Sequence, residues 1–152
     1  MLERVFTALR AQRVVLEQIL VKPNMVLPGA SSPRQASVRE VAEATARCLR
    51  RAVPPAVPGI VFLSGGQDAQ AATAHLNAMN AMGTTHPWPL SFSFARALQA
   101  PALEAWRGEP ANVTAGQRAF YHRAHCNSAA REGRYTPELE QAADALAGER
   151  RA

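Results

Sequence analysis

Of the 17 basic residues of the chain, Lys22 is a lysine and the rest are arginines. A guanidinium stays protonated and cannot act as an amine nucleophile, whereas a lysine can lose its proton and add to a carbonyl carbon. An amine kept at this one position favours carbonyl chemistry, in which Lys22 forms a carbinolamine and then a Schiff base. An arginine-rich chain can also keep one lysine by accident, so the neighbouring motifs must decide.

The segment Ser64-Gly65-Gly66-Gln67 has the composition of an anion-binding turn. Two glycines let backbone amides approach a phosphate, and the N-terminus of a following helix adds partial positive charge. We therefore expect Ser64, Gly65 and Gly66 to hold a phosphate. Taken alone, the segment is better explained as a glycine-rich turn with an ordinary helix cap.

Arg96 is expected at the start of a helix, where its positive charge opposes the helix dipole. A bound phosphate would offset that cost and would use the two-pronged guanidinium group. A solvated surface arginine is the simpler explanation of this residue in isolation. Together with Lys22 and the glycine turn, it predicts a site for a phosphorylated ketone or aldehyde.

Three apolar runs, each leading into one of these motifs, predict β-strands at residues 13–21, 60–63 and 87–94. Helices are predicted from 1 to 10, from the Ser37–Glu40 capping box to about 52, and then over 68–82, 95–106 and 111–131. Strands alternating with helices indicate βαβ units and a parallel sheet, whose ligands gather at the C-terminal ends of the strands.

The helical periodicity also predicts which side chains are buried. The first helix presents an apolar stripe of Leu2, Val5, Phe6 and Leu9, and the second presents Val38, Val41, Ala42, Thr45 and Leu49. Because the chain opens directly in a helix and a three-stranded parallel sheet has two open edges, we expect it to be part of something larger.

Composition narrows the class of protein. The chain has 152 residues, 47% apolar and 19% charged, which fits one globular domain. No run is long and apolar enough for a membrane span, and the N-terminus lacks the features of a secretory signal, so a cytoplasmic protein is expected. Cys48 and Cys126 are expected to be reduced, buried thiols.

The net charge of +5 and the pI of about 10.2 raise the question of nucleic-acid binding. The arginines are scattered, with no basic tract and no interleaved aromatic residues, so no nucleic-acid partner is expected.

His122 and His125, with Cys126 beside them, have a spacing that could present metal ligands on a helix. No carboxylate is placed in sequence to complete such a site, so no metal is expected.

Four strings, at residues 20–26, 53–67, 76–80 and 87–100, make the chain resemble the class I fructose-bisphosphate aldolases from about residue 2 to 137. The resemblance implies an α/β fold, an incomplete TIM (β/α)8 barrel of about three parallel βα units plus C-terminal helices. Residues 1–135 would be the C-terminal portion of the barrel and 136–152 a polar tail. It also implies a lyase of glycolysis that uses no metal or other cofactor.

In that family the lysine matching Lys22 forms the Schiff base, the residues matching Ser64, Gly65 and Arg96 bind substrate phosphate, and the serine matching Ser93 lines the site. The implied reaction is the reversible cleavage of fructose 1,6-bisphosphate to dihydroxyacetone phosphate and glyceraldehyde 3-phosphate. The substrate would be a phosphorylated ketose, and the protein partner another copy of the chain or a complementing aldolase chain.

The resemblance also implies what this stretch lacks. The family's earlier strands carry the aspartate, the two glutamates and the further lysines that transfer protons and bind the second phosphate. Ala95 stands where the family has a glycine whose amide approaches phosphate. An inactive fragment, incompetent without the missing strands, is therefore the alternative to an active aldolase.

Overall fold

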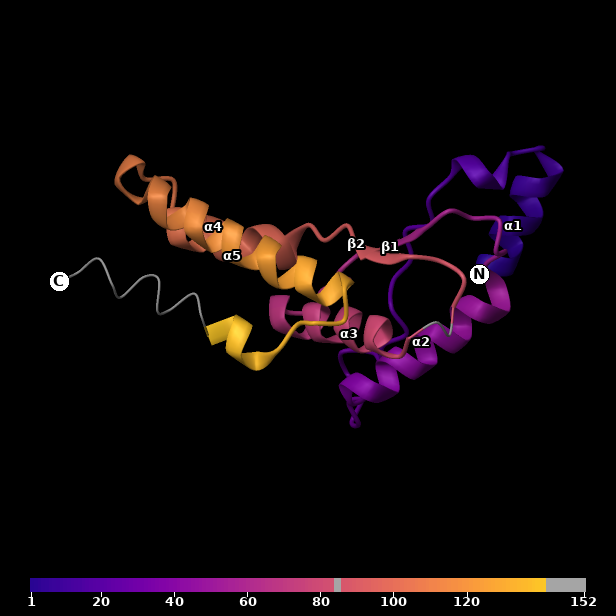
Figure 1. Cartoon of the computed structure of the whole chain (residues 1–152), viewed down its shortest axis with the longest axis horizontal. Coiled ribbons are helices and arrows are strands. Elements are labelled where there is room, and N and C mark those ends of the chain that lie inside the picture. The colour runs from indigo at the N-terminus through magenta and orange to yellow at the C-terminus, as the bar shows by residue number, and fades with distance from the viewer. Residues whose placement is uncertain (84–85, 142–152) are drawn as a thin grey trace.

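The computed structural model describes residues 1–83 and 86–141, which form an α/β structure (Figure 1). Its elements follow in chain order: α1 (Leu2–Ala11), η1 (Leu16–Gln18), α2 (Val38–Ala52), β1 (Ile60–Phe62), α3 (Ala69–Ala81), β2 (Leu90–Phe92), α4 (Arg96–Trp106), η2 (Pro110–Asn112) and α5 (Val113–Arg131), where η marks a short 3₁₀ helix.

The sheet is parallel, as the sequence predicts. Ile60 of β1 pairs with Leu90 of β2, and Phe62 pairs with Phe92. Residues 21–23 extend the sheet on the other side of β1, through an isolated bridge between Val21 and Ile60. The order across the sheet is therefore 21–23, then β1, then β2.

The strand predicted over residues 13–21 is wrong for most of its length. Arg13 has a left-handed backbone, with a φ of 56°, and Leu16–Gln18 form η1. Only the end of the run pairs with a neighbour. The β-branched composition was misleading because β-propensity measures how well side chains pack on a neighbouring strand; the bridge to β1 begins at Val21.

The two faces of the sheet differ in burial. Ile60, Phe62 and Leu90 are buried in one hydrophobic core with residues of α2, α3 and α5. Val61 and Ser91, which alternate with them, are only half-buried. Because successive side chains of a strand point to opposite faces, this second face carries Val61 and Ser91. Val21 pairs with Ile60 and so lies on the Ile60 face; Lys22, the next residue, therefore lies on the Val61 face.

Helix α2 holds the segment that follows Lys22. Its capping box forms as predicted: the Ser37 hydroxyl accepts from the Glu40 amide and the Glu40 carboxylate accepts from the Ser37 amide. On the buried face, the Thr45 hydroxyl accepts a hydrogen bond from the Val26 amide at 2.9 Å. Val41, Ala42 and Leu49 are buried as well.

Two residues of the predicted apolar stripes are exposed instead. Val38 is 40% exposed because it is the first residue of α2, and Val5 of α1 is 46% exposed. Phe6 is the buried residue of α1, with Leu2 and Leu9 packed at the edge of the core.

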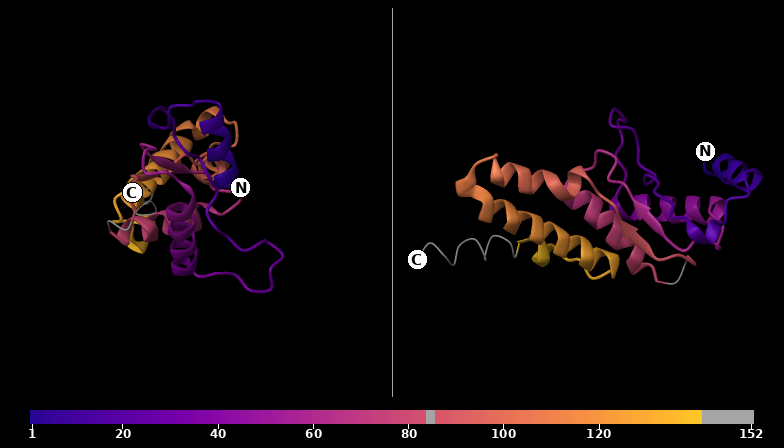
Figure 2. Two further views of the ribbon diagram at one scale, coloured as in Figure 1. Left: turned by 90° about the vertical axis from the view of Figure 1, so that its right-hand side faces the viewer. Right: turned by 90° about the horizontal axis from the view of Figure 1, so that it is seen from above.

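Helices α4 and α5 form an antiparallel hairpin that extends away from the end of the molecule where α1 lies (Figures 1 and 2). The turn begins at Arg107, which caps α4 in the left-handed conformation. Gly116 lets the helices approach closely, because a Cβ there would lie 2.9 Å from the Cβ of Trp106. No helix in the described part of the chain is long and apolar enough to cross a membrane.

The capping box gives a first prediction. Ser37→Ala removes the side-chain acceptor of the Glu40 amide and should lower the free energy of unfolding by about 1 kcal/mol in urea titrations. Ser31→Ala, at an exposed serine before the helix, is the control and should change it by less than about 0.5 kcal/mol. Equal effects of the two substitutions would show that the box does not stabilise α2.

Candidate functional site

Lys22 lies between two residues whose backbones are fixed to β1. The Val21 amide donates to the Gly59 carbonyl at 3.3 Å, the Val61 amide donates to the Val21 carbonyl at 2.9 Å, and the Leu63 amide donates to the Pro23 carbonyl at 3.1 Å. The Lys22 side chain is exposed. Across residues 1–83 and 86–141, no hydrogen bond or ion pair engages its ammonium group, so the amine is open to a ligand.

The turn after β1 is packed against the segment that follows Lys22. Gly65 and Gly66 both have left-handed backbones, with φ values of 61° and 85°. A Cβ on Gly65 would lie 2.4 Å from Oδ1 of Asn24, the same atom that accepts a hydrogen bond from the Met25 amide at 2.9 Å. Glycine is therefore required at 65 by both conformation and space.

The Ser64 carbonyl is held by Gln67, whose amide and side-chain Nε2 both donate to it, at 3.1 and 2.8 Å. Gln67 Oε1 in turn lies 2.6 Å from Nδ1 of His75 in α3. Burial lowers the pKa of His75, opposed in part by Asp68, so the neutral ring is favoured and donates from Nδ1 to Gln67. This chain of hydrogen bonds fixes the glycine turn to α3.

The sequence analysis did not identify His75 as part of this bracing. The side chain is only 7% exposed. The available signal was its spacing, because His75 directly precedes Leu76 and falls three residues after Ala72 on the buried side of the helix.

Arg96 reaches the glycine turn from α4. Its Nη2 lies 3.9 Å from the point where a Cβ of Gly66 would stand. Both residues line a cavity of about 280 Å³, whose wall also includes Asp68 and Glu104. The structure thus brings together Gly66 and Arg96, as the sequence predicts for a phosphate site, but with two carboxylates nearby that oppose an anion.

Of the two helix N-termini beside the glycine turn, that of α4 is the one without a side-chain cap. Asp68 caps α3, accepting from the Ala71 amide at 2.8 Å, and so fills the position at which a phosphate was expected. At α4 the cap residue is Ala95, with no side-chain cap, so the Arg96 and Ala97 amides are free for a ligand, whereas the Leu98 amide donates to the Ala95 carbonyl. The Ala95 φ of −96° lies outside the left-handed region, and its methyl group therefore brings no left-handed strain.

Ser93 follows β2, and its amide donates to the Phe62 carbonyl at 2.8 Å. Alternation from Ser91 places it on the same, less buried face of the sheet as Lys22. The predicted site residues therefore arrive from three consecutive strand ends: Lys22 from the first, Ser64 and Gly65 from the second, and Ser93 and Arg96 from the third.

Comparison with known proteins gives the family. Residues 1–149 match the family model of glycolytic fructose-bisphosphate aldolase class-I. The chain belongs to the class I fructose-bisphosphate aldolase family. It is 50% identical over 137 residues to a fructose-bisphosphate aldolase of Dictyostelium discoideum, covering 90% of this chain and 38% of that protein. It is 53% identical over 135 residues to the cytosolic fructose-bisphosphate aldolase 5 of Arabidopsis thaliana, covering 89% of this chain and 37% of that protein.

Comparison with solved structures also matches the chain to an aldolase. A solved structure of fructose-bisphosphate aldolase from Plasmodium falciparum superposes with a TM-score of 0.86 and 47% identity, covering 89% of this chain and 39% of that one. The predicted fold class, part of an aldolase barrel with parallel strands and helices, is therefore confirmed. The chain spans about 38% of the length of the aldolases it matches.

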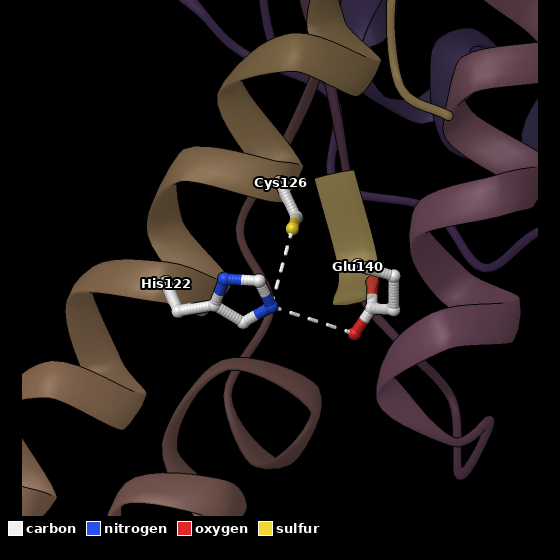
Figure 3. Close-up of side chains that lie close together, drawn as sticks. All are labelled: His122, Cys126 and Glu140. Carbon is white, nitrogen blue, oxygen red and sulfur yellow. Dashed lines mark hydrogen bonds and ion pairs between the residues drawn. The ribbon is translucent and has the colours of Figure 1, made fainter. Parts of the chain in front are cut away.

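A second cluster of polar side chains corrects the treatment of the cysteines and histidines. Glu140 lies beside His122 and Cys126, so the inference that no carboxylate is placed to complete a metal site was wrong (Figure 3). His125 is not part of the cluster; its exposed ring stacks on Tyr121. Cys126 is buried as expected, but Cys48 is exposed.

The segment 136–152, expected as a polar tail, contributes Glu140 to this cluster, and residues 142–152 lie outside the described residues. Sequence reasoning missed the contact because Glu140 lies fourteen positions after Cys126. The chain turns back at Gly133, whose φ is 69°, and this turn brings Glu140 beside α5.

The contact between Gly65 and Asn24 gives a second prediction. Gly65→Ala should lower the free energy of unfolding by about 1 kcal/mol more than Gly108→Ala, because both positions are left-handed but only a Cβ at 65 displaces Asn24 from the Met25 amide. Gly108 has no atom within 4 Å of its Cβ position, which makes it a matched control. In an Asn24→Ala background the two substitutions should cost the same; a difference that persists there would contradict the proposed packing.

Proposed function

We propose that this chain carries the Schiff-base half of a class I fructose-bisphosphate aldolase site, with Lys22 as the nucleophile. The reaction is the reversible cleavage of fructose 1,6-bisphosphate to dihydroxyacetone phosphate and glyceraldehyde 3-phosphate. The observation that carries the proposal is the convergence of an unpaired amine, a left-handed glycine turn and Arg96 at three neighbouring strand ends. Family membership supports the choice of a phosphorylated ketose as substrate.

In the proposed chemistry, the neutral Lys22 amine adds to the C2 carbonyl of the ketose, and loss of water gives an iminium ion. The iminium withdraws the electron pair of the C3–C4 bond as that bond breaks, which leaves an enamine on Lys22 and releases the aldehyde. A base must take the proton of the C4 hydroxyl in this step. Addition of a proton to C3 and of water to C2 then releases dihydroxyacetone phosphate.

The phosphate of the ketose would be held at the turn 64–66 and at the N-terminus of α4, with Arg96 supplying the positive charge. Backbone amides at a helix start and a guanidinium group are both suited to phosphate oxygens. Ser93 would line the site between this phosphate and Lys22, since it lies on the Lys22 face of the sheet.

No carboxylate lies beside the amine to act as the base: in the described part of the chain, none has an oxygen within 4.0 Å of the Lys22 nitrogen. This observation favours the second candidate function, a chain that forms the Schiff base but turns over only with a complementing aldolase chain or a further copy. Loss of a general acid or base costs a factor of about 10² to 10⁴ in rate.

A cytoplasmic location goes with this function, and one relative is named as cytosolic. A nucleic-acid role is not supported, because several arginines are engaged by carboxylates. Ion pairs join Arg34 to Glu40, Arg39 to Glu43, Arg123 to Glu140 and Arg134 to Glu132.

Borohydride trapping tests the nucleophile. Incubation with dihydroxyacetone phosphate and borohydride should add one reduced adduct, located at Lys22 by peptide mass analysis, and Lys22→Arg should abolish it. An adduct that persists in Lys22→Arg, or its absence from the unmodified chain, would overturn the assignment.

Arg96→Gln should slow trapping of dihydroxyacetone phosphate about tenfold, but should not slow trapping of unphosphorylated dihydroxyacetone.

Arg107→Gln is the matched control, because Arg107 is an exposed arginine at the other end of α4 and does not line the cavity of Arg96. It should leave both trapping rates unchanged. Equal slowing by Arg96→Gln and Arg107→Gln would remove Arg96 from the phosphate site without affecting the role of Lys22.

A further inference from the structure

A cluster beside α5 brings together one nitrogen, one sulfur and one oxygen atom that could bind a metal ion. They belong to His122, Cys126 and Glu140 (Figure 3). His122 and Cys126 are one turn apart on α5, and the segment after Gly133 returns to place Glu140 beside them. The three potential ligand atoms all lie within 4.8 Å of one another. Lys22 belongs to the opposite, less buried face of the sheet, so this cluster is separate from the proposed Schiff-base site.

Two of the three ligand spacings are close to those around a tetrahedral metal ion. With a metal–sulfur bond of about 2.3 Å and metal–nitrogen and metal–oxygen bonds of about 2.0 Å, tetrahedral angles separate sulfur from nitrogen by about 3.5 Å and nitrogen from oxygen by about 3.3 Å. Cys126 Sγ lies 3.6 Å from His122 Nε2. His122 Nε2 lies 3.8 Å from Glu140 Oε1, about 0.5 Å more than the tetrahedral spacing.

The carboxylate is already oriented by donors from outside the cluster. The buried Arg123 forms an ion pair with Oε1, and the Tyr135 hydroxyl donates to Oε2 at 2.7 Å. Arg123 Nη2 also donates a hydrogen bond to Thr73 Oγ1 at 3.0 Å, which fixes the guanidinium group. Each carboxylate oxygen keeps a second lone pair for a metal, and hydrogen bonds of this kind commonly hold ligating carboxylates in place.

We propose that His122, Cys126 and Glu140 bind a Zn²⁺ ion, leaving a fourth coordination position open. One histidine, one thiolate and one carboxylate form a donor set suited to this borderline-soft ion. Binding requires the Cys126 thiol to lose its proton, which leaves to solvent. The ion then supplies the positive charge that the buried thiolate lacks, and it ties the segment around Glu140 to α5.

Burial raises the pKa of Cys126 to about 11, with Glu140 adding to the rise and Arg123 opposing it. In the metal-free protein the thiol is therefore protonated at neutral pH, and its S–H points to the Leu139 carbonyl at 3.7 Å.

Cobalt substitution tests the site in the full chain. Co²⁺ should produce a thiolate-to-cobalt charge-transfer band in the near ultraviolet, with visible bands of four-coordinate intensity. The band should disappear in Cys126→Ser and persist in Cys48→Ser, since the exposed Cys48 is the chain's other thiol. A band that follows Cys48, or no band in the unmodified chain at about 1 mM Co²⁺, would overturn the proposal.

Zinc affinity measured by calorimetry gives an independent readout. His122→Ala should weaken Zn²⁺ binding by at least about 100-fold, whereas His125→Ala, one turn away on an exposed face, should not change it. Tyr135→Phe keeps all three ligands and should weaken binding about tenfold. Zn²⁺ should also raise the urea midpoint of the unmodified chain but not that of Cys126→Ser. Equal Zn²⁺ affinity in His122→Ala and His125→Ala would contradict the site.

Discussion

The pairing of residues 21–23 with β1 is the interaction on which the rest of the site depends. Three backbone hydrogen bonds fix the segment on either side of Lys22; they join Val21 and Pro23 to Val61 of β1 and to Gly59 and Leu63, which flank that strand. Because Lys22 alternates with Val21, this pairing sets the face of the sheet to which its side chain belongs. The glycine turn at the end of β1 is then packed against Asn24, two residues past the lysine.

The sheet separates two kinds of environment. One face is buried under α2, α3 and α5, and the largest fully buried side chains, Phe62, Ile60 and Leu76, belong to this core. The other face carries the exposed amine and the half-buried Ser91 and Ser93. The helical layer therefore provides stability and positions the turns, while the less buried face is the one suited to bind a carbonyl substrate.

The features that could be predicted from the sequence are those set by local chemistry. The Ser37 cap involves residues three apart, and the apolar run 60–63 is short and unambiguous, so both were predicted correctly. The strand predicted over 13–21 failed because strand formation depends on a partner distant in sequence, and here only the last residues have one. The α3 cap by Asp68 was missed because the preceding glycines suggested a ligand instead.

Contacts between distant side chains lay beyond the sequence. Gln67 and His75 meet only because a turn and a helix fold together, and Glu140 reaches Cys126 only after the chain reverses at Gly133. Family resemblance did identify the residues of the proposed Schiff-base site, because its strings are contiguous around Lys22, Ser64 and Arg96. The resemblance did not identify the cluster beside α5, because His122 and Cys126 belong to that helix and Glu140 to the segment after Gly133.

Hydrogen exchange at three backbone amides of this sheet tests the central pairing most directly. The Val61 and Leu63 amides donate to Val21 and Pro23, so both should exchange at least about 100-fold more slowly than the Lys22 amide, which has no acceptor among the described residues. The Ile60 amide, which donates to Pro89 on the β2 side, is the internal reference and should be protected in either case. Fast exchange of Val61 and Leu63 beside a protected Ile60 would show that the lysine segment is not fixed to the sheet, and would contradict the account.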